Sequence, residues 1–331
     1  MWTLSRLVEG FDAGWRFSGS SFAAQSSHDV WKGVGLRLLA MTPAEMEGLV
    51  IGPVTHHVGR ERVAAFVDVT GDDAERWREH APPGYAAALL FAVAGDFLTD
   101  PRIAPYLATL IHIDQQFTFS GPIPIGTDVV VTGAVDRVRE RGGAYFVTFV
   151  ATGEVDGGVV LESRSTFLMS DEAAGEAATD APEPAVGDCG RNDTAGGSSE
   201  VQVGQTSTMA KSASRKDLIR YSAATGDFNP LHWDHKSARA AGLEGVVVHG
   251  LLMLSWLAQQ ASAFGTGPAP VATIKVRFRS ALPPAEAARI EATVKDITID
   301  RREADIGLRL GVGEADVVTG SAVVRLEAVT P

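Results

Sequence analysis

The segment Thr225–His232 reads Thr-Gly-Asp-Phe-Asn-Pro-Leu-His and brings a carboxylate and an imidazole close together along the chain. Further on, the pair His249-Gly250 opens an apolar run. Asp227 and His232 can exchange protons with a bound molecule, and a backbone N–H at the start of a helix can stabilise a negatively charged oxygen. These are the parts that acid–base chemistry on a carbonyl compound needs.

The residues between the acid and the imidazole predict an ordered loop. Pro230 blocks a continuing helix and biases Asn229 towards an extended backbone. We therefore expect Asp227 and His232 to converge through a loop that Asn229 supports with local side-chain to backbone hydrogen bonds. Asp234 precedes a helix-prone stretch and is a candidate N-cap.

Each of these residues also has a structural interpretation. Asp227 follows a glycine and fits a turn, and a single histidine such as His232 is more often structural than catalytic. We interpret His249 as a packing or hydrogen-bonding residue at the helix start. The histidines at positions 56, 57 and 235 have no convergent partners, so we predict no metal site. We also expect no cofactor.

The composition sets the broad class of the protein. A chain of 331 residues with 45% hydrophobic and 21% charged residues fits two globular domains. The net charge of −12 argues against nucleic-acid binding. The longest apolar runs are too short to cross a bilayer, and Met1–Arg16 lacks the features of a secretory signal, so a cytoplasmic location is expected. A single cysteine, Cys189, excludes an internal disulfide.

Much of the acidic excess lies in residues 171–200, which hold eight acidic side chains and one basic side chain, Arg191. This segment has no aromatic residue and one branched aliphatic residue, Val186. Such a composition cannot bury enough apolar surface to offset its ordering entropy, which predicts a flexible linker. Residues 1–46 are an N-terminal extension, residues 47–170 and 201–331 form two domains, and Cys189 falls in the linker.

The two domains are related by a weak internal repeat. Val69-Thr70-Gly71-Asp72 corresponds to Ala224-Thr225-Gly226-Asp227, and each segment is followed by an apolar helix and a strand with prolines near its exit. Strand-like runs come next in both halves, divided by Gly, Asp and Asn; they span 129–138, 144–152, 159–169, 289–299, 304–311 and 316–327. The pattern predicts an α+β fold in which antiparallel strands wrap one long apolar helix in each half.

The halves differ in the stretch that carries the polar motif. From Asp227 to Gly250 there are 23 positions, against 12 from Asp72 to Gly84. The first half thus keeps the scaffold and lacks the Asn-Pro-Leu-His segment. We hypothesise that its apolar helix, Tyr85–Phe97, borders space for a long or bulky acyl chain.

The second-half segment from Tyr221 to Asp234, together with Val248-His249-Gly250-Leu251, resembles the MaoC-like (R)-specific enoyl-CoA hydratase family. The first half is similar to the N-terminal dehydratase-like domain of that family, notably at Pro82-Pro83-Gly84-Tyr85. The resemblance covers roughly residues 47–169 and 201–329. It implies a double hotdog fold: two antiparallel sheets that each wrap a long apolar helix, paired as a pseudo-dimer within one chain.

The resemblance also implies a reaction and its site. It implies hydration of 2-enoyl thioesters, or the reverse dehydration of (R)-3-hydroxyacyl thioesters, with Asp227 and His232 as catalytic residues and the Gly250 N–H as the oxyanion contact. The partner would be an acyl-CoA or acyl-carrier-protein thioester, and a homodimer stays open. A thioesterase and a non-catalytic acyl-thioester-binding protein are the alternatives.

Lys275, Arg277 and Arg279 alternate along one predicted strand, so their side chains share a face. Such a row can bind the phosphates of CoA, with Arg277 as the first candidate. An ordinary solvated strand face is an equally good interpretation.

Overall fold

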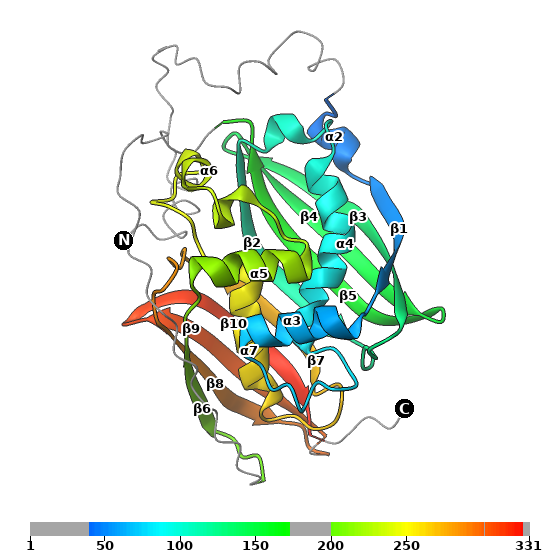
Figure 1. Ribbon diagram of the computed structural model, residues 1–331, viewed down its shortest axis with the longest axis vertical. Helices are drawn as coiled ribbons and strands as arrows, with labels where there is room; N and C mark the ends of the chain where they lie inside the picture. The colour runs from blue at the N-terminus through cyan, green and yellow to red at the C-terminus, as the bar shows by residue number, and fades with distance from the viewer. Residues whose placement is uncertain (1–39, 173–199, 301, 327–331) are drawn as a thin grey trace.

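A computed structural model describes residues 40–172, 200–300 and 302–326 (Figure 1). Nearly all of the predicted linker, including Cys189, and most of the predicted extension lie outside the described residues. The helix α2 (Pro43–Met46) falls inside the predicted extension. Thr42 and Glu45 form a capping box at its start, and Met46 is buried in the core of the first half. Among the described helices, none has the length and apolar composition needed to span a membrane.

The described strands form one antiparallel sheet in the order β1-β3-β4-β5-β2-β7-β10-β9-β8-β6. Both halves therefore repeat one strand order, with β2 and β7 in the middle and β1 and β6 at the edges. The bounds are β1 Val50–His57, β2 Thr109–Phe119, β3 Asp128–Arg141, β4 Ala144–Val155, β5 Gly158–Ser170, β6 Thr206–Lys211, β7 Val271–Phe278, β8 Ala288–Ile297, β9 Glu303–Val312 and β10 Ala315–Arg325.

The two expected sheets are joined edge to edge. β2 pairs with β7 from Asp114↔Arg277 to Thr118↔Thr273, so the two predicted sheets are continuous. Edge strands with unpaired N–H and C=O groups invite further pairing, and this junction satisfies the inner edge of each half. The halves consequently act as one framework around the space between their helices.

The long apolar helices α4 (Ala86–Thr99) and α7 (Gly250–Ser262) lie on one face of the sheet (Figure 1). Both are apolar on most sides, because one side packs on strands and the other is covered by further helices. The covering helices are α3 (Arg60–Thr70) and α5 (Arg215–Thr225), which lie side by side across the middle of the molecule. Each ends at a glycine in the left-handed region, Gly71 and Gly226, directly before the paired aspartates of the repeat.

The α+β prediction and the internal repeat are thus confirmed. The extra polar stretch of the second half forms η4 (Pro230–His232) and the short helix α6 (His235–Ala240). Asp234 caps α6 as expected, accepting hydrogen bonds from the N–H groups of Lys236 and Ser237. The first half crosses from Asp72 to η2 (Pro83–Tyr85) without such elements.

A buried histidine in the first half makes the unfolding free energy sensitive to acid. His56 Nε2 lies 3.1 Å from the Tyr85 hydroxyl, and burial, with smaller contributions from Arg62 and His57, lowers the pKa of His56 to about 4. In the unfolded chain His56 has an ordinary pKa near 6.5, so between pH 6.5 and 4 it binds a proton there and stays neutral in the folded protein. The contribution of neutral His56 to the free energy of unfolding is therefore fully present above about pH 6.5 and is lost as the pH falls towards 4. The full shift corresponds to at most about 3.4 kcal/mol, and to about 1–2 kcal/mol after allowance for solvent screening.

We expect His56→Gln, which keeps a polar partner for Tyr85, to flatten the loss of stability between pH 6.5 and 4.5. Urea unfolding at several pH values measures this change. His80→Gln is the control, because His80 also lies in the first half and is not among the groups that shift the pKa of His56. Equal slopes for wild type and His56→Gln would contradict the expectation.

Candidate active site

A cavity of about 100 Å³ lies where the two halves meet. The second half supplies its polar groups and the start of α7, and the first half supplies mostly apolar side chains from α4, β2 and β5. Lining residues include Asp227, Asn229, His232, Gly250, Phe278, Ser280 and Ala281 from the second half, and Phe91, Leu98, Leu110, His112 and Phe167 from the first. The predicted site residues Asp227, Asn229, His232 and Gly250 are therefore brought together.

The loop between Asp227 and His232 is held by its own side chains. Asp227 Oδ1 accepts a hydrogen bond from the N–H of Asn229, and Asn229 Oδ1 accepts one from the N–H of Leu231. Asn229 is also the N-cap of η4, a single turn that ends at His232. The short turn, with Pro230 as its first residue, directs Asp227 and His232 towards the same cavity.

The contacts of His232 indicate its tautomer. Its Nδ1 lies 2.8 Å from the carbonyl oxygen of Val247, and a carbonyl can only accept, so Nδ1 carries the proton. In a neutral ring, Nε2 then keeps its lone pair. The imidazole stacks on that of His249, with ring centroids 3.7 Å apart, which fixes its plane.

His249 is the N-cap residue of α7 and is fully buried. Its Nε2 contacts the Ser222 hydroxyl at 3.0 Å and the carbonyl oxygen of Asp227 at 3.3 Å. The packing and hydrogen-bonding interpretation of His249 fits these contacts. The ring ties the Asp227 backbone to the start of α7 and supports His232 from behind.

Burial shifts the two titratable groups of the site in opposite senses. Asp227 is 6% exposed and His232 is 9% exposed. Burial raises the pKa of Asp227, while His232 and the Asn229 N–H oppose the shift. Burial lowers the pKa of His232, while Asp227 and the Val247 carbonyl oppose it. Such a pair suits proton transfer near neutral pH, because the carboxylate becomes a stronger base and the imidazole stays uncharged.

Gly250 is the first residue of α7, so its N–H has no acceptor within the helix. A Cβ at this position would lie 3.0–3.3 Å from the ring of Phe278. Glycine therefore allows close packing of α7 against β7, and it also leaves the helix start open to a bound molecule. The helix dipole favours negative charge at this end.

A residue of the first half contacts the segment that leads into the site. Arg62, on α3, donates from Nε to the carbonyl oxygen of Ala224 at 2.7 Å, in the last turn of α5. In return, Lys211 of β6 donates to the carbonyl oxygens of Thr70 and Gly71 at the end of α3. Each half thus binds the helix terminus that precedes the aspartate of the other half.

The corresponding region of the first half is nearly filled. A small cavity of about 10 Å³ lies among Pro83, Phe119, Gly121, Pro122 and their neighbours, in the place that the repeat assigns to a second site. No side chain in its described wall can exchange a proton. This difference favours one chemically equipped site in the chain.

One set of donor atoms in the described residues could hold a metal ion. The ligand atoms of Asp227, His232 and His249 all lie within 4.8 Å of one another. Hydrogen bonds to Val247, Ser222 and the Asp227 carbonyl already engage one nitrogen of each histidine. The arrangement equally accommodates one water molecule between the carboxylate and His232, and the absence of a metal stays a prediction.

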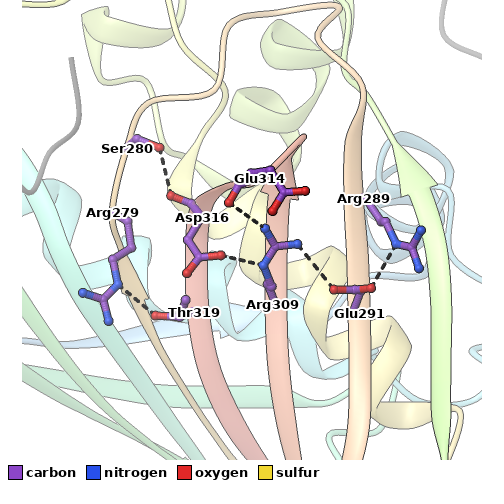
Figure 2. Close-up of polar contacts among 8 residues, drawn as sticks. All are labelled: Arg279, Ser280, Arg289, Glu291, Arg309, Glu314, Asp316 and Thr319. Atoms are coloured by element: carbon purple, nitrogen blue, oxygen red, sulfur yellow. Dashed lines mark hydrogen bonds and ion pairs between the residues drawn. The ribbon is translucent and has the colours of Figure 1, made fainter. Parts of the chain in front are cut away.

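The basic row lies on the other face of the sheet. Lys275, Arg277 and Arg279 are exposed, whereas Val276 and Phe278 between them are buried beneath the helices. Arg279 donates to the Thr319 hydroxyl, and beside it Arg309 connects Asp316 with Glu291, which also pairs with Arg289 (Figure 2). Within the described part of the chain, Lys275 and Arg277 form no ion pair, so their charges are available. The CoA-phosphate role stays a prediction, because none of the three basic residues lines the cavity, which Phe278, Ser280 and Ala281 of the same segment reach.

Each half of the chain matches the profile of a known protein family. Residues 196–314 match the profile of the family described as MaoC like domain, and residues 45–163 match that described as FAS1-like, dehydratase domain region. The second half thus contains a MaoC like domain, and the first half contains a FAS1-like dehydratase region. A solved structure titled MaoC-like dehydratase has a TM-score of 0.72 at 20% identity and covers 86% of this chain and all of that one.

One further solved structure bears on the fold, and one curated relative has a name that states a reaction. A Mycobacterium tuberculosis structure described as a double hotdog has a TM-score of 0.57 at 12% identity, covering 87% of this chain and 99% of that one. The 3-hydroxyacyl-thioester dehydratase X of the same species is 24% identical over 66% of this chain and 68% of its own length. A Streptomyces griseus protein named only UPF0336 is 28% identical over 37% of this chain and 89% of its own. The double hotdog fold is confirmed, and the chain is a hydro-lyase.

Proposed function

We propose that this MaoC-like protein adds water to 2-enoyl thioesters and, in reverse, dehydrates (R)-3-hydroxyacyl thioesters carried on CoA or acyl carrier protein. One observation carries the proposal. The carboxylate of Asp227 and the imidazole of His232 lie within 4.8 Å in a cavity that also contains the start of α7. This is the set of groups that addition of water next to a thioester requires.

In the proposed reaction each group has a task. Asp227 and the lone pair on His232 Nε2 hold one water molecule between them, and Asp227 removes its proton as the oxygen bonds to C3. Negative charge then moves to the thioester oxygen, which the Gly250 N–H and the α7 dipole stabilise. The proton on Asp227 passes to C2, which completes the addition of H and OH across the double bond.

The shape of the cavity supports an acyl-binding role for the first half. Phe91 and Leu98 of α4 and Leu110 of β2 form an apolar wall beyond the polar groups. Such a wall favours long or bulky chains through burial of apolar surface. Equal rates on four-carbon and long-chain substrates would count against this acyl-binding role.

The deciding assay follows the loss of enoyl absorbance when wild-type protein meets a panel of 2-enoyl-CoAs. A thiol reagent run in parallel detects free CoA, which a thioesterase would release and a hydratase would not. Comparison of (R)- and (S)-3-hydroxyacyl-CoA in the reverse direction tests the stereochemistry. Release of thiol without loss of the double bond would show that the protein is a thioesterase and not a hydratase.

The contact from Arg62 gives a prediction about coupling between the halves. Arg62→Met removes the charged donor from the carbonyl of Ala224, and hydrogen bonds of this kind contribute about 1.5–3 kcal/mol. We expect a comparable loss of unfolding free energy, and a several-fold lower kcat because the Asp227 loop starts at this helix end. Arg60→Met is the matched control, since Arg60 also donates to a carbonyl, that of Arg78, at an exposed position of the same helix. A normal kcat in Arg62→Met would show that the contact serves stability alone.

A further inference from the structure

His112 is a polar exception in the apolar wall that the first half contributes. It lies on β2, lines the cavity, and has an Nε2 atom that is enclosed and without a hydrogen-bond partner. Its ring contacts Phe167 at a centroid distance of 4.7 Å and Phe278 at 5.1 Å. Because Phe278 also packs against Gly250, His112 lies one ring away from the start of α7.

A bulge in β2 turns His112 towards the cavity. The pairing of β2 with β5 skips a residue between His112 and Asp114. Beyond the skip, Gln115 and Phe117 face the helices, and strict alternation would continue this orientation to Ile113 and Ile111. Instead, both isoleucines pack in a separate cluster with Ala144 and Leu168. One extra residue thus turns the imidazole into the wall, next to Leu110 and Ile111, and such bulges often re-aim a side chain at a site.

The imidazole of His112 is a neutral hydrogen-bonding group. Burial lowers its pKa to about 4, hydrogen bonds with the Asp114 backbone and the Gln115 side chain oppose the shift, and His232 adds slightly to it. At neutral pH the ring offers one N–H and one lone pair and carries no charge. It is therefore suited to a hydroxyl, keto or ether oxygen and has no charge with which to attract a carboxylate.

An enclosed polar atom without a partner weakens binding of any ligand that leaves it unpaired. The ring contacts Phe167 and Phe278, and Nε2 itself has no hydrogen-bond partner among the described residues. Sites built to hydrogen bond a substrate group discriminate strongly against analogues that lack it, whereas apolar pockets discriminate weakly.

We propose that His112 is a specificity-determining residue of this site, and that it hydrogen bonds an oxygen-bearing group on the acyl chain of the substrate. The substrate class is then acyl thioesters with a hydroxyl, keto or ether oxygen beyond C3. The inference rests on the proposed hydratase function and names its substrate more narrowly.

The test uses pairs of 2-enoyl-CoAs of equal length, in which one member has a keto group at a successive position from C5 onwards. Wild-type protein is expected to favour the keto member at one position by about 10-fold or more in kcat/KM. His112→Phe should abolish or reverse this ratio, and His112→Gln should keep part of it. His56→Phe replaces another buried histidine, outside the cavity, and should leave the ratio as in wild type. Thermal unfolding confirms that each variant is folded.

Two results would overturn the inference. One is an unchanged ratio in His112→Phe, and the other is an equal fall in kcat on every substrate, which would place His112 in the catalytic machinery. Calorimetric binding of the matching saturated acyl-CoA pairs separates this inference from the proposed function. If wild-type protein hydrates nothing, a binding preference for the keto member that His112→Phe removes still supports the role of His112. Equal Kd values in both proteins refute it.

Discussion

Replacement of His232 by glutamine is expected to lower kcat on 2-enoyl-CoA by about 10²–10⁴-fold, and Asp227→Asn should do the same. Both groups hold one water molecule, so removal of either leaves the other without its reacting partner. For this reason the double variant should lose little more activity than either single variant, as expected for residues that act as a unit. Steady-state loss of enoyl absorbance measures all three.

The pH profile adds a second measurement. Asp227 must be ionised to remove the proton of water, and burial raises its pKa above the ordinary value. Activity should therefore fall on the acid side at a higher pH than an exposed aspartate would give. His232 stays neutral over the same range because its pKa is lowered. Asp227→Asn should remove this acid limb from the residual activity.

The internal repeat offers a matched control for Asp227. Asp72 occupies the same place at the end of α3, but the first half lacks the His-bearing turn, and its small cavity has no proton-exchanging side chain. Asp72→Asn is expected to leave kcat unchanged. Full activity in both Asp227→Asn and His232→Gln would remove the acid–base assignment altogether.

The sequence predicted those features that depend on local chemistry. Runs of β-branched residues predicted the strands of both halves. The apolar stretch after Gly250 predicted α7, because a helix that is buried on several sides must carry apolar residues on all of them. The turn from Asp227 to His232 could also be predicted from the sequence, since Pro230 and Asn229 restrict the backbone directly. The repeat showed that the first half lacks this turn.

The features that the sequence did not predict depend on contacts between distant segments. The contact from Arg62 to Ala224 joins residues 162 positions apart, and no local pattern marks it. The inward orientation of His112 depends on a bulge, and alternation alone would have placed this side chain on the outer face. The union of the two sheets through β2 and β7 likewise depends on the docking of the halves. Such features follow from packing, which a single sequence does not display.

The start of α7 gives the second large effect, and here the backbone itself can be changed. Gly250→Pro removes the N–H that is proposed to stabilise the thioester oxygen. Proline is well tolerated at the first position of a helix, where the N–H has no partner within the helix. The preceding residue, His249, has φ −56° and ψ 133°, an extended conformation that proline favours in its neighbour.

Gly250→Ala is the control for this variant. Both substitutions introduce a Cβ near the ring of Phe278, and only proline also removes the N–H. Loss of a single oxyanion donor costs about 10²–10³-fold in kcat, so we expect the proline variant to lie below the alanine variant by that factor. Binding of a saturated acyl-CoA should differ much less between them, because the charge on the oxygen develops only during reaction. Equal kcat values for the two variants would show that the oxyanion is stabilised elsewhere, and would leave Gly250 with only its packing role against Phe278.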